Sequence, residues 1–327
     1  MRSLPTLALL AALLPALSAE AAELLNVSYD VTREFYKDFN PAFAQYWKDK
    51  TGETVQINQS HGGSSKQARA VIDGLEADVI TMNRAADIDI LAEKGKLIPA
   101  NWQSRLPNNS VYSASPTVFL VRKGNPKQIK DWDDLVRPGV AVIIPNPKTS
   151  GNGKYSYLGA WGFVTQKGGD PAKARQFVTE LFKHVPVLDA GGRGATTTFA
   201  QRELGDVLLT FENEIQLIQQ EFGDNKYEAV YPSVTVLAEN PIALVDKVVD
   251  KKGTRKVAQA YLDYHFSAAG QAIAAKHYLR PQVVETSQPA FRKVQTFTVK
   301  QAFGGWSEAE KVHFSDGGLF DQIYQKQ

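Results

Sequence analysis

The chain has 327 residues, with 37 basic and 35 acidic side chains and a formal net charge of +2 at neutral pH. This balance argues against a nucleic-acid partner, which requires a concentrated basic face. The sequence contains no cysteine, which excludes thiolate zinc sites and cysteine nucleophiles and leaves core burial as the source of stability.

The first residues have the pattern of a secretory signal peptide. Met1-Arg2-Ser3 is followed by an apolar run to about Leu17 and by an A-x-A site at Ala19-Glu20-Ala21. The run is shorter than the ~20 residues of a membrane-spanning helix, and no later stretch is long enough either. We therefore expect residues 1–22 to be removed and the exported chain to be free in solution as a monomer, without stable membrane insertion.

The first third of the chain alternates between strand and helix patterns. Strands are predicted at 24–29, 54–58 and 77–81, and helices at 35–47, 65–74 and 88–93. Pro41 predicts a kink or break within the first helix. Strand, glycine turn, helix and strand in succession are typical of a parallel α/β sheet.

The rest of the chain continues this alternation. Strands are predicted at 117–121, 140–144, 207–211, 227–231 and 243–245, and helices at 155–164, 171–184, 197–204, 254–266 and 270–277. The length corresponds to about two domains, yet no flexible linker separates them. We therefore expect one domain to be inserted in the other, with the chain crossing between them near 112–118 and 234–244.

Three loops rich in small residues precede helix-forming sequence, at 59–67, 145–153 and 189–196. The first amides of a helix lack intrahelical partners and lie at the positive end of its dipole. Small residues allow an anion to approach those amides closely. The bend at Asp30, after the first strand, is a fourth candidate. Together these segments favour the capture of a small anion.

Each loop also has a purely structural interpretation. Ser64 is a candidate N-cap that offers its hydroxyl and nearby amides, and an ordinary capped helix explains it equally well. Asp30 can cap its own helix with its carboxylate while its backbone N–H faces a ligand. Arg193 can pair with an anion directly or make a buried structural or inter-lobe ion pair. The second loop resembles a phosphate-binding P-loop, but Tyr155 and Lys148 break that pattern and argue against a nucleotide.

Signals for catalysis are weak. The chain has no G-x-S-x-G elbow, and its histidines lack metal-ligand spacing. We expect no enzyme activity, no cofactor and no metal. An exported hydrolase with a nucleophile at Ser64 or Ser150 is kept as an alternative.

With these residues the chain resembles the periplasmic sulfate/thiosulfate-binding proteins that feed ABC importers. The matching runs are 24–30, 59–64, 119–127, 145–151, 192–194, 205–208 and 303–306. The resemblance extends over essentially the whole mature chain. It implies a type II periplasmic binding protein, with two α/β lobes, a central mixed sheet in each, a ligand in the cleft between them and a membrane permease as partner. The expected first lobe is discontinuous (23–115 and 241–327), and the expected second lobe is 116–240.

The family's ligand contacts, transferred by position, are the backbone N–H groups of Asp30 and Ser64, the hydroxyl of Ser150, and the N–H groups of Gly151, Asn152 and Gly192. Arg193 is expected to support these ligand-binding residues without contacting the ligand itself. Phe211 stands where many sulfate-binding members have a tryptophan that donates its indole N–H, and this exchange is similar to the thiosulfate-binding branch. Sulfate and thiosulfate both remain candidate ligands, and binding of thiosulfate, or of both anions, is slightly favoured. Molybdate and phosphate are the alternatives, and phosphate gains if the Asp30 carboxylate reaches into the cleft.

Overall fold

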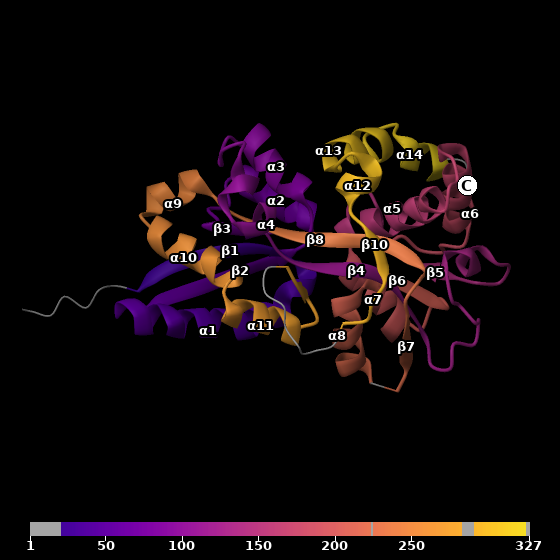
Figure 1. Cartoon of the computed structure of the whole chain (residues 1–327), viewed down its shortest axis with the longest axis horizontal. Helices are drawn as coiled ribbons and strands as arrows, with labels where there is room; N and C mark the ends of the chain where they lie inside the picture. The colour runs from indigo at the N-terminus through magenta and orange to yellow at the C-terminus, as the bar shows by residue number, and fades with distance from the viewer. Residues whose placement is uncertain (1–20, 224, 283–290, 325–327) are drawn as a thin grey trace, which may run out of the picture.

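A computed structural model describes residues 21–223, 225–282 and 291–324. The predicted signal peptide lies almost entirely outside these residues. The described chain forms two lobes placed side by side along the long axis of the molecule (Figure 1), with helices on both faces of a mixed sheet in each lobe.

The sheet runs through both lobes and contains ten strands among the described residues. Its order is β2-β1-β3-β8-β4-β6-β5, with β10 on β8 and with β7 and β9 on β4. The strand bounds are β1 (Ala22–Tyr29), β2 (Val55–Gly62), β3 (Val79–Thr81), β4 (Val111–Arg122), β5 (Val142–Ile143), β6 (Val207–Phe211), β7 (Tyr227–Val230), β8 (Val234–Leu244), β9 (Arg280–Pro281) and β10 (Gln295–Phe297). In the first lobe β1 pairs in parallel with β2 and β3, as the α/β pattern predicts.

The two longest strands belong to both lobes. The end of β8 pairs with β3 through Ile242, Ala243 and Leu244 in the first lobe, and its start pairs with β10 in the second. Strand β4 pairs with β8 and then, from Thr117 onwards, with β6. Figure 1 shows these two strands running between the lobes. From this pairing we propose that β4 and β8 are the segments in which the chain crosses between the lobes, as expected near 112–118 and 234–244.

The helices of the first lobe cover both faces of its sheet. They are α1 (Arg33–Thr51), α2 (Ser64–Ile72), α3 (Ala85–Glu93), α4 (Pro107–Ser110), α9 (Asp246–Lys252), α10 (Arg255–His265) and α11 (Ala268–Lys276), with short turns η1 (Asp30–Thr32) and η2 (Trp102–Arg105). The prediction of a break at Pro41 was wrong, because α1 continues through it. Phe39, Phe43 and Trp47 bury one face of α1 on both sides of the proline, and this packing holds the helix together.

The helices of the second lobe are α5 (Gly151–Gln166), α6 (Pro171–Lys183), α7 (Gly192–Thr196), α8 (Glu212–Phe222), α12 (Val299–Phe303), α13 (Trp306–Ala309) and α14 (Leu319–Tyr324). Short helical segments are η3 (Trp132–Val136), η4 (Thr197–Gln201) and η5 (Glu310–Phe314). One hydrophobic cluster lies beneath α5 and α6, and a second lies beneath α7 and α8.

The C-terminal segment packs on the second lobe rather than on the first. Phe297, Trp306 and Phe314 join the buried cluster formed by α5 and α6, and in Figure 1 α12, α13 and α14 lie on that side. The sequence-based division assigned 241–327 to the first lobe. From this packing we propose instead that residues 291–324 belong to the second lobe and that 241–282 belong to the first.

Candidate functional site

A small cavity lies between the two lobes where the predicted loops meet. It offers ≈ 20 Å³ to the centre of a water-sized sphere, and one buried water needs roughly 10–15 Å³ by a similar measure. A space of this size suits a small ion. Its lining residues are Tyr29, Asp30, Val31, Gly62, Gly63, Ser64, Asn83, Ser150, Gly151, Asn152, Gly191, Gly192, Phe211 and Glu214.

Seven of the predicted site residues therefore come together: Asp30, Ser64, Ser150, Gly151, Asn152, Gly192 and Phe211. Arg193 does not line this cavity. Its side chain is 62% exposed and pairs with Glu221 of α8 at 2.8 Å between Nη2 and Oε2. Arg193 therefore makes an exposed ion pair within the second lobe, which is neither a contact with the cavity nor the buried or inter-lobe pair considered from the sequence.

Three helices begin at the cavity with amides that have no helical partner. The first backbone bond of α2 is donated by Gln67 to the Gly63 carbonyl at 2.9 Å, that of α5 by Lys154 to Ser150 at 3.0 Å, and that of α7 by Ala195 to Gly191 at 3.1 Å. The three amides before each of these donors have no acceptor within their own helix, and of these only the Gly153 amide of α5 is taken up by a side-chain cap. The cavity thus receives N–H groups from both lobes together with the positive ends of helix dipoles.

Ser150 is the N-cap of α5, and its side chain is almost fully buried. Its Oγ accepts a hydrogen bond from the Gly153 amide at 3.3 Å. A hydroxyl that accepts one bond can still donate its own proton. Ser150 can therefore cap the helix and donate into the cavity at the same time.

The Ser64 hydroxyl neither caps α2 nor faces the cavity, in contrast to the capping role considered from the sequence. Gly63, not Ser64, is the N-cap of α2. The Ser64 hydroxyl donates to Oδ2 of Asp87 at 2.5 Å and lies 3.3 Å from the sulfur of Met82. Because the hydroxyl is engaged within the first lobe, the residue offers the cavity its backbone amide alone.

The expected cap by Asp30 is also wrong. Tyr29 is the N-cap of η1, without a side-chain hydrogen bond, and the Asp30 carboxylate lies 3.7 Å from the Arg33 guanidinium instead. Burial raises the pKa of Asp30 against the opposing charges of Arg33 and Arg193. The carboxylate also approaches the other lobe, with Oδ2 3.9 Å from where a Cβ on Gly191 would lie. It therefore lies at the cleft and does not point away from it, which is the position in which the sequence analysis gave phosphate more weight.

Asn83 is a lining residue that the sequence analysis missed. It follows β3, and its Oδ1 is buried without a hydrogen-bond partner among the described residues. A Cβ added to Gly151 would lie 2.6 Å from that oxygen, so the lobes meet here with room for glycine only. Tyr155 of α5 donates to the Asn83 carbonyl at 2.8 Å. Asn83 comes directly after a strand of a parallel sheet, where ligands often bind. That position was the one signal in the sequence that could have indicated Asn83 as a site residue.

Glu214 is the second residue that was missed. It lies in the first turn of α8, three residues after Phe211, and its side chain is 4% exposed. Burial, and then the negative charge of Asp30, raise the pKa of Glu214 to about 8. Acidic residues in a first helical turn are common because they complement the helix dipole, so the sequence pattern alone did not single it out.

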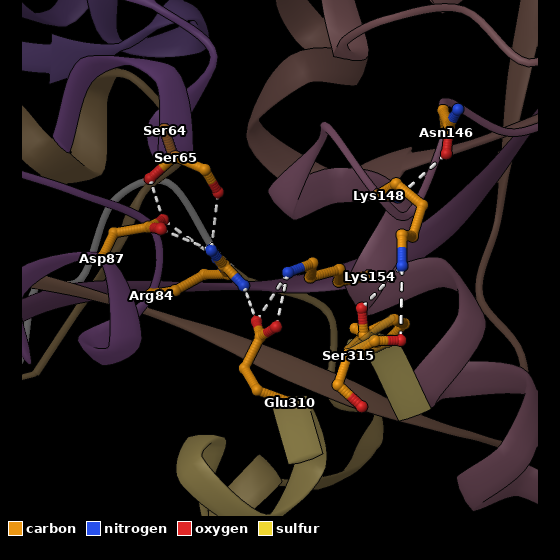
Figure 2. Close-up of polar contacts among 10 residues, drawn as sticks. Ser64, Ser65, Arg84, Asp87, Asn146, Lys148, Lys154, Glu310 and Ser315 are labelled. Atoms are coloured by element: carbon orange, nitrogen blue, oxygen red, sulfur yellow. Dashed lines mark hydrogen bonds and ion pairs between the residues drawn. The ribbon is translucent and has the colours of Figure 1, made fainter. Parts of the chain in front are cut away.

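A network of ionic side chains joins the lobes beside the cavity (Figure 2). Arg84 of the first lobe is buried and pairs with Asp87 and with Glu310 of η5. Glu310 also accepts from Nζ of Lys154, in the first turn of α5, at 2.6 and 2.7 Å. Burial and the nearby Arg84 lower the pKa of Lys154 to about 8. The network connects the starts of α2 and α5, since Arg84 also donates to Oγ of Ser65 at 2.7 Å.

A wider groove of ≈ 970 Å³ adjoins the cavity and shares Asp30 and three glycines with it. Lys66, Arg69 and Lys94 are exposed and line this groove. Positive side chains at the mouth of a cleft raise the local concentration of anions. The described ranges contain no group of three or more acidic, histidine or cysteine residues arranged to hold a metal, and none of their helices is long and apolar enough to cross a membrane.

A family model for bacterial extracellular solute-binding proteins matches residues 25–280. The chain belongs to this family. It is 60% identical to a thiosulfate-binding protein of Pseudomonas aeruginosa over 311 residues, with 94% of each chain covered, and 53% identical to a sulfate-binding protein of Escherichia coli over 312 residues, again with 94% of each covered. The solved sulfate-binding protein of Mycobacterium tuberculosis superposes with a TM-score of 0.78 at 29% identity, covering 89% of this chain and 98% of that one.

These similarities confirm two predictions made from the sequence. The two-lobed α/β fold of a periplasmic binding protein is the fold of this chain. It is a solute-binding protein and not an enzyme, so the alternative of an exported serine hydrolase is set aside.

Proposed function

We propose that this protein binds sulfate or thiosulfate in the cavity between its lobes and delivers the anion to an ABC importer. The observation that carries the proposal is the convergence of unpaired amides from α2, α5 and α7, with the Ser150 hydroxyl, on one space that suits a small ion. The names of the relatives, a thiosulfate-binding and a sulfate-binding protein, support the same ligand class.

The donors are sufficient for useful affinity. A buried dianion loses much hydration energy, so its oxygens need donors. Six hydrogen bonds to a charged ligand, at ~1.5–3 kcal/mol each, would contribute roughly 9–18 kcal/mol. Micromolar affinity requires about 8 kcal/mol, which leaves free energy for closing the lobes. Neutral donors can therefore replace basic side chains inside the cavity.

Phe211 favours thiosulfate as a ligand alongside sulfate. Its ring is buried at the end of β6 and packs edge-on against Tyr155, with centroids 5.6 Å apart. A phenyl wall offers no donor, and the terminal sulfur of thiosulfate is a weaker acceptor than oxygen. At this wall thiosulfate therefore loses less hydrogen-bonding energy than sulfate does.

Titration calorimetry of the mature protein with sulfate, thiosulfate, phosphate and molybdate tests the proposal. We expect the two sulfur anions to bind at micromolar concentrations or tighter and phosphate to bind at least about tenfold more weakly, because its remaining proton would face a donor. Tighter binding of phosphate or molybdate would contradict the proposed ligand. Phe211→Trp should improve sulfate relative to thiosulfate, and an unchanged ratio would remove the argument from Phe211.

We propose further that the mature protein works as a monomer in the periplasm after removal of residues 1–22. The extracellular location named for the family supports export of the chain. N-terminal sequencing of protein from the periplasmic fraction tests the cleavage, and light scattering of the same sample tests the oligomeric state.

A further inference from the structure

The side chain of Glu214 has an unused oxygen at the cavity wall. Within the described residues its Oε1 is buried without a hydrogen-bond partner. That atom lies 3.4 Å from where a Cβ on Gly192 would be, beside the first amide of α7. A buried polar atom left unpaired costs ~1–3 kcal/mol. Because Glu214 lines the cavity, a bound ligand is the partner best placed to remove this cost.

The other oxygen of Glu214 is already an acceptor. Oγ1 of Thr210 donates to Glu214 Oε2, and the same Thr210 oxygen accepts from Nδ2 of Asn152 at 3.4 Å. Because Oε2 already accepts from Thr210 and Oε1 has no partner within the described residues, we place the proton of the neutral acid on Oε1, and Oε2 is then the carbonyl oxygen.

The charged neighbours favour that neutral acid. Asp30 of η1 faces Glu214 from the first lobe, and its negative charge opposes ionisation. The Tyr29 hydroxyl of β1 is coupled to Glu214 and stays protonated, because burial raises its pKa. Arg193 of α7 acts in the opposite direction, but its guanidinium is exposed and paired with Glu221. With a pKa of about 8, Glu214 is mainly neutral at pH 7.

We propose that Glu214 determines specificity by binding the oxyanion as a neutral carboxylic acid that donates the proton on Oε1. This inference rests on the proposed function of the cavity. In its ionised form the same group would repel a dianion across a few ångströms of protein. A donor at this position also disfavours an anion that keeps a proton of its own, since two protons would then face each other.

The dissociation constants of sulfate and thiosulfate between pH 6 and pH 9.5 test the proposal, because neither anion changes charge in this range. When only the protonated form binds, affinity is constant well below pH 8 and falls above it. For a pKa of about 8, the wild type should bind about tenfold more weakly at pH 9 than at pH 7. A flat wild-type profile would overturn the proposal.

Glu214→Gln keeps an N–H donor in the same place and cannot ionise. We expect it to bind within about threefold of the wild type at pH 7 and to change by less than about threefold up to pH 9. Lys154 loses its charge over the same range, so a larger change in this variant would assign the effect to Lys154 and overturn the proposal. Glu180→Gln is the matched control, because it removes an exposed acid of α6 in the same lobe, paired with Lys183 and not with a neighbour of Glu214, and it should keep the tenfold change.

Calorimetry of the wild type in two buffers of different ionisation enthalpy gives a test that does not depend on a variant folding. At pH 8.5, binding should take up about 0.8 of a proton if the pKa is about 8, and uptake near zero would contradict the role of Glu214. The two proposals fail differently: if neither sulfur anion binds at pH 7, the proposed function is wrong, whereas binding without proton uptake refutes the role of Glu214 alone.

Discussion

The helices α2 and α5 both begin at the cavity, but their first turns are held in different ways. Helix α5 buries every residue from Gly151 to Phe163, and the Ser150 side chain caps its start. Helix α2 buries four residues, and Gly63 begins it without a side-chain cap. The Ser64 hydroxyl points instead into a hydrogen bond with Asp87.

This difference indicates a division of labour between the lobes. The wall formed by α5 is fixed by packing within the second lobe, so its donors need little ordering when the ligand arrives. The wall formed by α2 meets the second lobe through two contacts between the lobes, the hydrogen bond of Tyr155 to the Asn83 carbonyl and the ion pair of Arg84 with Glu310. Binding should therefore be more sensitive to changes in the second lobe than to matched changes in the first.

The largest effect is expected for Gly151→Ala. The added Cβ would lie 2.6 Å from Oδ1 of Asn83, and such overpacking should weaken binding by about 3 kcal/mol, roughly a hundredfold. The fold should survive, because alanine suits the first turn of a helix. Gly63→Ala is the matched control in the first lobe, since its Cβ would make an ordinary 3.7 Å contact with the Thr149 carbonyl. Equal losses in the two variants, measured by calorimetry, would contradict the division of labour.

The next effect is expected for Ser150→Ala. Loss of a hydroxyl donor to a charged ligand should weaken binding by about 1–3 kcal/mol. Loss of the N-cap should also lower the free energy of unfolding by ~1 kcal/mol. Ser150→Thr retains both functions and serves as the comparison. Unchanged affinity in Ser150→Ala, with protein that is shown to be folded by circular dichroism, would remove Ser150 from the site.

A smaller effect is expected for Glu310→Gln, which tests the network that joins the lobes (Figure 2). The change leaves Arg84 with Asp87 but deprives Lys154 of its anionic partner. Glu310 is partly exposed, so we expect a loss in ligand affinity of roughly 1 kcal/mol, or about fivefold. The loss should appear mainly as faster ligand dissociation in stopped-flow fluorescence. A change confined to the association rate would argue against a role in holding the lobes together.

The smallest effect on binding is expected for Ser64→Ala. Its hydroxyl is bonded to Asp87 and not to the cavity, so affinity should stay within about threefold of the wild type. The loss of a donor to a buried carboxylate should appear in stability, as a decrease of ~1–3 kcal/mol in the free energy of unfolding. Denaturant titration measures this decrease. A loss of affinity as large as that of Ser150→Ala would show that the two hydroxyls have equivalent roles.

Local pattern was enough to predict much of the fold. The strand and helix alternation located most elements, and the small-residue loops located the starts of α2, α5 and α7. Pro41 shows the limit of such reasoning, because tertiary packing along α1 outweighs the local penalty of one missing backbone bond. The C-terminal segment shows another limit, since nothing in its local pattern tells which lobe its aromatic residues will pack against.

Side-chain roles at the cavity were harder to predict than the positions of its amides. The start of a helix fixes the positions of its first backbone N–H groups, and helix starts have local sequence signals. The direction of the Ser64 hydroxyl depends on Asp87, and the ion pair of Arg84 depends on Glu310, which is 226 residues away. No spacing in the sequence encodes such partners.

By itself, the sequence determined that this chain forms alternating α/β layers and that several of its helices start with small residues able to approach an anion. The tertiary structure alone decided which of those amides share a cavity, that Asn83 and Glu214 join them, and that burial and the charge of Asp30 raise the pKa of Glu214. The physical reason is that hydrogen bonding within a helix is local, whereas burial and charge depend on every segment that packs nearby.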